Sequence, residues 1–133
     1  MNALNRFTDP VYCIMRLIVG LMLACHGAQL VLGMFGPGSD KPMMLQVGGC
    51  IQLVGGFMVA FGLLTRLAAF ILSGEMAVAY FMFHAKQNFF PILNKGELAV
   101  FYCWVFLFVF FYGAGRWSID ALMGQGRAAA ATR

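Results

Sequence analysis

Charged residues are scarce in this chain. Asp, Glu, Lys and Arg make up 11% of its 133 residues, whereas a soluble domain carries about 25%. So few charges cannot cover a surface that faces water, and 62% of the residues are hydrophobic. The composition therefore excludes an ordinary soluble domain and predicts an integral membrane protein. The net charge of +4 requires no nucleic acid, because basic residues beside anionic lipid headgroups account for it.

Sequence motifs for covalent or metal chemistry are also missing. The cysteines form no CxxC pair and all lie in apolar segments, so we expect inert core residues and not a thiol relay. No HxxH or ExxH pair indicates a metal site, and the two histidines lie at different expected depths, which disfavours bis-histidine haem. The sequence thus predicts no metal and no tightly bound cofactor. The cysteines are Cys13, Cys25, Cys50 and Cys103.

What the chain does contain is four long apolar segments, at about 11–35, 45–64, 67–85 and 98–115. Each is close to the ~20 residues that span ~30 Å of hydrocarbon as a helix. Strict alternation of polar and apolar residues is absent, which argues against a β-barrel. The short connections make neighbouring helices antiparallel. We predict an all-α integral membrane protein, a four-transmembrane-helix antiparallel bundle over residues 1–120, followed by a flexible cytoplasmic tail at 121–133.

The distribution of basic residues predicts an orientation. If the N-terminus lies inside, six arginines fall on or near the cytoplasmic side and three lysines fall outside. This bias places both termini in the cytoplasm, and we expect a bacterial cytoplasmic (inner) membrane protein. The inner residues are Arg6, Arg16, Arg66, Arg116, Arg127 and Arg133, and the outer residues are Lys41, Lys86 and Lys95.

Glycines in the second segment follow a regular spacing. Gly48, Gly55 and Gly62 recur every seven residues and share one face of the expected helix. Gly20 and Ala24 form a small-xxx-small pair in the first segment. Small residues let helix backbones approach closely in a membrane, where no hydrophobic effect drives association. We therefore predict tight helix packing, or room for a flat ligand, along these faces.

Two charged side chains stand out inside the apolar segments. Arg16 lies a few residues from the inner end of the first segment, and Glu75 lies near the middle of the third. A charge at mid-bilayer costs about 2.5–3.5 kcal/mol on insertion scales, so such residues normally find partners. One interpretation pairs Arg16 with Glu75. The alternative is that Arg16 snorkels to the cytoplasmic headgroups while Glu75 stays protonated or meets an outer imidazole.

A second polar cluster belongs to the outer half of the predicted bundle, and comprises His26, Gln52, His84, Asn94 and Glu97. Asn94 and Glu97 are spaced as a capping box at the start of the fourth helix. Imidazole and carboxyl groups beneath an apolar roof could hydrogen-bond the carbonyls of a quinone and exchange protons with it. The same residues could equally be structural hydrogen bonds between helices.

Five stretches of the chain carry a resemblance to a known family. They occur in order along nearly the whole chain, and the resemblance is to the DoxX family of small four-helix membrane proteins. One departure lies at residues 29–32, where relatives often carry a lysine. The stretches are Arg16 with CHG at 25–27, GGFMVAFGLLTRLAA at 55–69, EMAVAYFMFH at 75–84, FPILNKGELAVFYC at 90–103 and GAGRWSID at 113–120.

The resemblance implies a four-helix bundle with both termini inside, and an association with quinol oxidase and thiosulfate:quinone oxidoreductase systems. It transfers no catalytic residue. Two functions follow as hypotheses. The first is a membrane component of quinone-linked redox chemistry with no tightly bound cofactor of its own. The second is a non-catalytic accessory subunit of a larger respiratory or photosynthetic membrane complex. The expected partners are the lipid bilayer, other membrane-protein subunits and, as a further option, a second copy of the chain.

Overall fold

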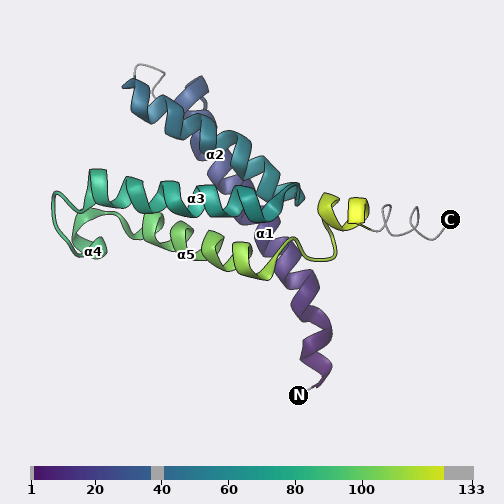
Figure 1. Ribbon diagram of the computed structural model, residues 1–133. Helices are drawn as coiled ribbons and strands as arrows, with labels where there is room; N and C mark the ends of the chain where they lie inside the picture. Colours follow the sequence, from purple (N-terminus) through teal and green to yellow (C-terminus); the bar gives the residue numbers. More distant parts are fainter. Residues whose placement is uncertain (1, 37–40, 125–133) are drawn as a thin grey trace.

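The computed structural model describes residues 2–36 and 41–124, and it is helical throughout with no strand in those ranges (Figure 1). Three stretches are long and apolar enough to cross a membrane, at Leu4–Leu32, Met43–Phe61 and Thr65–His84. A fourth apolar helix, Glu97–Tyr112, is shorter at 16 residues. The all-α prediction is confirmed, whereas a fourth span and the orientation of the termini stay predictions. The helices are α1 (Asn2–Leu32), α2 (Met43–Phe61), α3 (Thr65–Ala79), η1 (Tyr80–His84), α4 (Pro91–Asn94) and α5 (Glu97–Tyr112).

The first helix differs most from its predicted bounds. It begins at Asn2 and runs through Pro10, although the apolar segment begins only at residue 11. Polar residues can continue a helix beyond the hydrocarbon region, so an apolar segment marks the span and not the helix end. At the other terminus, residues 119–124 are helical, whereas 125–133 of the predicted tail, including Arg127 and Arg133, lie outside the described residues.

Helices α1 and α2 pack backbone against backbone. A Cβ added at Gly20 would lie 2.6 Å from the Ala60 nitrogen and 2.7 Å from the Gly56 oxygen. Gly27 approaches the backbone of α2 equally closely, near Leu53. No side chain larger than hydrogen fits at these positions, as expected where helices associate in lipid. The prediction from small residues in α1 is therefore confirmed.

The two helical members of the predicted glycine stripe on α2 both face α3, and two neighbouring glycines face α1. Gly48 and Gly55 face Glu75 and Leu72 of α3, while Gly49 and Gly56 face α1. Gly62 lies beyond the helix as its C-terminal cap, with φ of 72°, a conformation that glycine adopts readily. The heptad spacing therefore identified a packing face at Gly48 and Gly55, whereas the close approach to α1 uses Gly49 and Gly56.

The four long helices form two pairs. Helix α1 packs along α2, α3 packs along α5, and a smaller contact between α2 and α3 joins the pairs (Figure 1). The Ser73 hydroxyl of α3 donates to the Cys103 carbonyl of α5 at 2.8 Å, so the second pair is also in close contact. Leu72, Val59 and Phe106 are fully buried and fill the space between the pairs.

Hydrogen bonds join the two pairs where the α2–α3 turn meets residues 113–120. We call this part of the molecule the closed end. The Asp120 carboxylate accepts hydrogen bonds from the Leu64 and Thr65 backbone nitrogens at 2.8 and 2.9 Å, and from the Thr65 hydroxyl at 2.7 Å. The Tyr12 hydroxyl donates to the Gly113 carbonyl at 2.5 Å. These bonds tie α1, α3 and the segment after α5 together.

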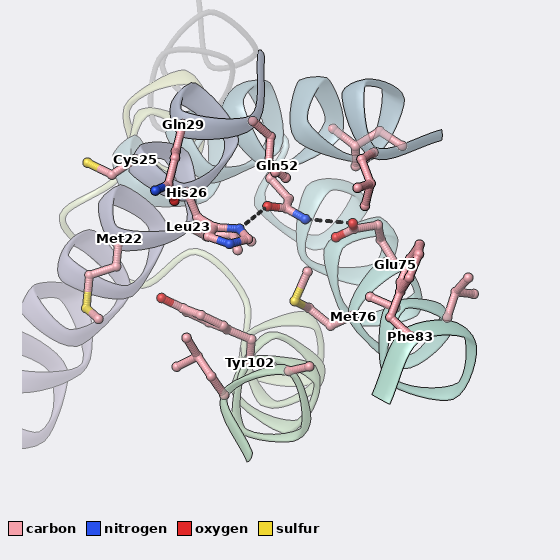
Figure 2. A pocket seen from close by; sticks show the side chains of 18 of the residues that line it. Met22, Leu23, Cys25, His26, Gln29, Gln52, Glu75, Met76, Phe83 and Tyr102 are labelled. Carbon is pink, nitrogen blue, oxygen red and sulfur yellow. Dashed lines mark hydrogen bonds between the residues drawn. The ribbon is translucent and has the colours of Figure 1, made fainter. Parts of the chain in front are cut away.

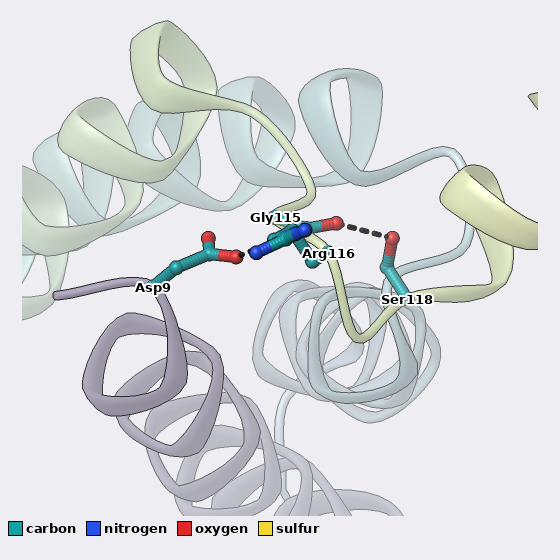
Figure 3. A network of polar contacts seen from close by, with 4 residues as sticks. All are labelled: Asp9, Gly115, Arg116 and Ser118. Atoms are coloured by element: carbon teal, nitrogen blue, oxygen red, sulfur yellow. Dashed lines mark hydrogen bonds and ion pairs between the residues drawn. The ribbon is translucent and has the colours of Figure 1, made fainter. Parts of the chain in front are cut away.

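Two further contacts lie at the closed end (Figure 3). Arg116 approaches Asp9 of α1 at 3.7 Å, but its side chain is 86% exposed. The Ser118 hydroxyl donates to the Gly115 carbonyl at 2.8 Å and closes a local turn. A solvent-exposed ion pair contributes little to stability, so the three hydrogen bonds to Asp120 and the buried bond of Tyr12 hold this end.

Candidate functional site

A cleft of about 1120 Å³ lies between the two helix pairs, at the end opposite the closed end. Ligand sites in proteins usually occupy about 300–1,000 Å³, so the cleft has room for a cofactor-sized molecule. Its walls are mostly leucine, methionine, valine and phenylalanine side chains from α1, α2, α3, η1 and α5. We call the part of the molecule that contains the cleft the open end.

A row of three polar side chains crosses this apolar cleft (Figure 2). His26 of α1 lies 2.7 Å from Gln52 of α2, between Nδ1 and Oε1. The Gln52 amide nitrogen donates to Glu75 Oε1 of α3, also at 2.7 Å. Gln52 is only 4% exposed, whereas His26 is exposed into the cleft that it lines. Three helices thus contribute one polar group each to a single hydrogen-bonded row.

The second carboxyl oxygen of Glu75 has no such partner. Oε2 is buried and makes no hydrogen bond to any described residue. Glu75 lines the cleft, and Gly48 opposite leaves it room, since a Cβ at Gly48 would lie 3.1 Å from Oε1. A buried polar atom without a partner costs free energy, and such groups are uncommon in native structures. Glu75 therefore presents an unused hydrogen-bonding position to the cleft.

The predicted pair between Arg16 and Glu75 is wrong. Arg16 is 2% exposed and donates to the carbonyls of Val59 at 2.8 Å and Trp117 at 2.7 Å, at the closed end. Val59 belongs to the last turn of α2, where its carbonyl accepts from the Gly62 nitrogen at 3.2 Å and carries partial negative charge. A guanidinium satisfies such carbonyls well, so Arg16 neither pairs with Glu75 nor snorkels to a surface.

His84 lies at the outer edge of the cleft and is held by the loop that follows it. The Ala85 nitrogen donates to the Tyr80 carbonyl at 2.9 Å, which makes Tyr80–His84 a π-helical turn. His84 Nδ1 lies 3.0 Å from the Asn94 carbonyl. Turns of this kind often occur at functional sites, because they turn side chains away from the regular helical direction.

Asn94 is buried, and its hydrogen bonds hold the loop between η1 and α5 in place. Its amide donates to the Tyr80 hydroxyl at 3.2 Å and to the Asn88 carbonyl at 2.6 Å. Its Oδ1 accepts from the Gly96 nitrogen at 2.8 Å. The Tyr80 hydroxyl in turn donates to the Phe89 carbonyl. Asn94 therefore organises this loop from inside and does not line the cleft.

The predicted capping box at the start of the fourth helix is wrong. Helix α5 begins at Glu97, and the residue before it is Gly96. Lys95 has a φ of 58°, which breaks the helix between Asn94 and Glu97. Asn94 consequently ends α4, and the exposed Glu97 side chain lies outside the cleft.

Of the seven predicted site residues, the structure brings four to the cleft: His26, Gln52, Glu75 and His84. Arg16, Asn94 and Glu97 lie elsewhere. Three polar residues outside the predicted set also line it, namely Gln29, Tyr102 and Lys95. Tyr102 of α5 is 5% exposed, and its hydroxyl makes no hydrogen bond to the described residues. Lys95 lies at the rim, and a positive charge in a predicted loop gave no signal that it would reach a cavity.

The cysteines do not share one environment. Cys13 is buried and Cys103 is half-buried, but Cys25 and Cys50 are exposed on the helix surfaces. Cys25 lines the cleft, whereas Cys50 does not. The expectation of four core cysteines is therefore wrong for two of them, since apolar segments have lipid-facing sides as well as buried ones. Within the described residues, no group of three or more His, Cys, Asp or Glu side chains could hold a metal ion.

Comparison with known proteins identifies the family. The family model named DoxX matches residues 11–85, which include the three residues of the polar row. The chain belongs to the DoxX family. An uncharacterized protein of Haemophilus influenzae is 42% identical over 128 residues, covering 90% of this chain and 96% of the relative. A second uncharacterized Haemophilus influenzae protein is 32% identical over 72 residues, covering 54% of this chain and 48% of the relative. No solved structure matches this DoxX protein.

Proposed function

We propose that this DoxX-family membrane protein takes part in quinone-linked redox chemistry and binds a quinone headgroup reversibly in its cleft, without a tightly held cofactor. The observation that carries the proposal is the buried Glu75 Oε2, which lines the cleft and has no partner among the described residues. A ligand hydroxyl would satisfy this oxygen as a carboxylate acceptor, and a ligand carbonyl would accept from it in the protonated carboxyl group. The His26 ring, at the other end of the row, offers a second hydrogen-bonding position in the same cleft.

The chemistry of a quinone suits the rest of the cleft. Its ring is flat and apolar, its two oxygens form hydrogen bonds, and its tail is hydrocarbon. The walls are apolar, and a small number of polar groups is the usual arrangement for fixing such a ligand. Tyr102 adds an aromatic ring and an unpaired hydroxyl within the described residues. Imidazole and carboxyl groups also exchange protons, which quinone chemistry requires.

We further propose that α5 is a fourth span and that both termini lie in the cytoplasm of a bacterial cell. A helix of 16 residues is about 24 Å long, so it can span the ~30 Å hydrocarbon core where the bilayer thins locally around it. Arg66 and Arg116 belong to the closed end, while Lys86 and Lys95 belong to the open end. Arginines gathered at one end support a cytoplasmic closed end.

Ligand binding by a matched pair of variants tests the quinone site. Binding of the quinone and hydroquinone forms of decylubiquinone is measured with the purified protein in lipid nanodiscs. Glu75→Leu removes the unpaired oxygen and is expected to weaken binding about tenfold, the equivalent of one hydrogen bond to a charged or strongly polar group. Glu97→Leu makes the same change outside the cleft and is expected to leave binding unchanged. Equal losses of ligand affinity in the two variants, or no ligand binding by the wild type, would contradict the proposal.

A second candidate function is that of a non-catalytic accessory subunit in a respiratory or photosynthetic membrane complex. The observation that favours it is an aromatic stripe on α5, where the spacing of three and four residues places the side chains on one face. Large aromatic side chains are enriched where proteins meet. Solubilisation of native membranes in mild detergent distinguishes the two: a large species of fixed stoichiometry supports the subunit, and a small species carrying quinone supports the binding site. The stripe comprises Phe101, Trp104, Phe108 and Phe111, all exposed.

A further inference from the structure

Gln52 lies at the centre of the polar row. It is almost completely buried, and its amide group lies between an imidazole and a carboxyl group that both line the cleft. It forms one hydrogen bond to each, and both are 2.7 Å long. Any change in the orientation of this amide therefore changes the hydrogen bonding of His26 and Glu75 together.

The two ends of an amide have fixed and opposite roles. The Oε1 atom can only accept a hydrogen bond, and the Nε2 group can only donate. Because Oε1 faces His26, the hydrogen in this bond belongs to His26 Nδ1. A neutral imidazole carries one hydrogen, so its Nε2 is then a bare acceptor. On the other side, Gln52 occupies Glu75 Oε1 and leaves Oε2 for the cleft.

We propose that Gln52 is a positioning residue that holds neutral His26 with its hydrogen on Nδ1, so that the cleft presents the Nε2 lone pair and selects a ligand group that donates a hydrogen bond. For the ligand proposed above, that group is a hydroxyl of the reduced, hydroquinone form. This last step rests on the proposed function. The tautomer of His26 does not, since it follows from the protein alone.

The chain offers an internal reference for the measurement, because it contains two histidines. His84 Nδ1 faces a backbone carbonyl, that of Asn94, which can only accept. His84 is therefore also expected to carry its hydrogen on Nδ1, but independently of Gln52. Nitrogen-15 NMR of histidine-labelled protein in nanodiscs, recorded at alkaline pH where the neutral rings are observed, distinguishes a protonated from a bare Nε2 at both residues.

Two substitutions of Gln52 separate positioning from simple packing. Gln52→Met keeps the length and volume but removes both hydrogen bonds, so the His26 signals are expected to shift to a ring protonated mainly on Nε2. Gln52→Glu keeps an oxygen that can accept from Nδ1, and a proton shared with Glu75 replaces the amide donor, so this variant is expected to retain the wild-type tautomer. The His84 signals should stay constant in both proteins and show that the fold is intact. A wild-type His26 with a protonated Nε2, or a Gln52→Met protein with unchanged His26 signals, would overturn the inference.

Addition of ligand tests the selectivity. The hydroquinone form of decylubiquinone is expected to bind the wild type about fivefold more tightly than the quinone form, the value of one hydrogen bond, and to shift the His26 Nε2 signal. In Gln52→Met the ratio of the affinities for the hydroquinone and quinone forms should fall to about one. Equal affinities in the wild type would overturn the selectivity. If neither form binds while the tautomer responds as expected, the proposed function fails and the positioning role of Gln52 stands.

Discussion

Asp120 provides the sharpest test of how the closed end is held. Its carboxylate lies at the start of α3, where Leu64 has no other side-chain cap, and accepts three hydrogen bonds from Leu64 and Thr65. Loss of a helix cap costs about 0.5–2 kcal/mol. Asp120→Ala removes all three bonds, so we expect a cost near the upper limit, about 2 kcal/mol. This free energy corresponds to a roughly 30-fold rise in the fraction of molecules in which the segments of the closed end have separated.

Cys13 is a natural reporter of that opening. It is buried, and its sulfur lies beside Gly115, where an added Cβ would approach it to 2.9 Å. Labelling of Cys13 by a thiol reagent, read by peptide mass spectrometry in nanodiscs, should accelerate about 30-fold in Asp120→Ala if opening is faster than labelling. Asp9→Ala removes the carboxylate of the exposed pair with Arg116 and should change the rate less than about threefold. Similar rates in both variants would refute the capping role of Asp120.

The same bonds predict a dependence on pH. Burial of Asp120 opposes its ionisation, but the hydrogen bonds from Thr65 and Leu64 outweigh that effect and lower the pKa of Asp120 below its ordinary value of 3.8. The stabilisation is therefore fully present above that value and is lost as the pH falls through the lowered pKa. Labelling of Cys13 with a pyridyl disulfide, which reacts in acid, should accelerate below about pH 4. Asp120→Ala should show no such acceleration.

Two further predictions concern the packing of the helices. Arg16→Lys should lower the free energy of unfolding by about 2 kcal/mol in a thermal or denaturant titration. One ammonium group cannot reproduce the hydrogen bonds of the guanidinium group to two separate carbonyls. An unchanged free energy of unfolding would contradict the role given to Arg16. Gly20→Ala should destabilise the protein by about 2 kcal/mol or more, because its Cβ meets backbone atoms of α2. Gly74→Ala, whose Cβ meets nothing within 4 Å, should be neutral or slightly stabilising, and equal effects at the two glycines would show that close backbone packing is not the cause.

Much of the fold follows from local composition, and the reasons are physical. Apolar segments of near-spanning length predicted the helices, since a backbone in lipid has few other ways to satisfy its hydrogen bonds. Helix ends were less predictable. Nothing apolar marks the start of α1 at Asn2, and the positive φ of Lys95 moves the start of α5 away from Asn94. Both depend on local backbone geometry beyond the apolar pattern.

The candidate site was predictable in its members but not in its connections. His26, Gln52 and Glu75 attract attention because polar groups within apolar segments need partners. Estimating depth along the helices then suggested Arg16 as the partner of Glu75. The proposed pair is wrong for two reasons. Helix α2 lies between α1 and α3, so Gln52 hydrogen-bonds to Glu75, and the Val59 carbonyl at the end of α2 accepts from Arg16. Such choices depend on which faces meet in three dimensions.

The central claim is that the cleft holds a quinone headgroup. It is tested most directly by comparing how a bound ligand changes the labelling of two cysteines. Cys25 and Cys50 are both exposed, but Cys25 lines the cleft and Cys50 does not. The protein in nanodiscs is treated with a membrane-permeant maleimide, with and without saturating decylubiquinone in its quinone and hydroquinone forms, and each cysteine is followed by peptide mass spectrometry. The account predicts that ligand slows labelling of Cys25 several-fold and leaves Cys50 unchanged, and that Glu75→Leu requires about tenfold more ligand for the same protection of Cys25. Equal labelling of Cys25 with and without ligand, or equal protection of both cysteines, would contradict it.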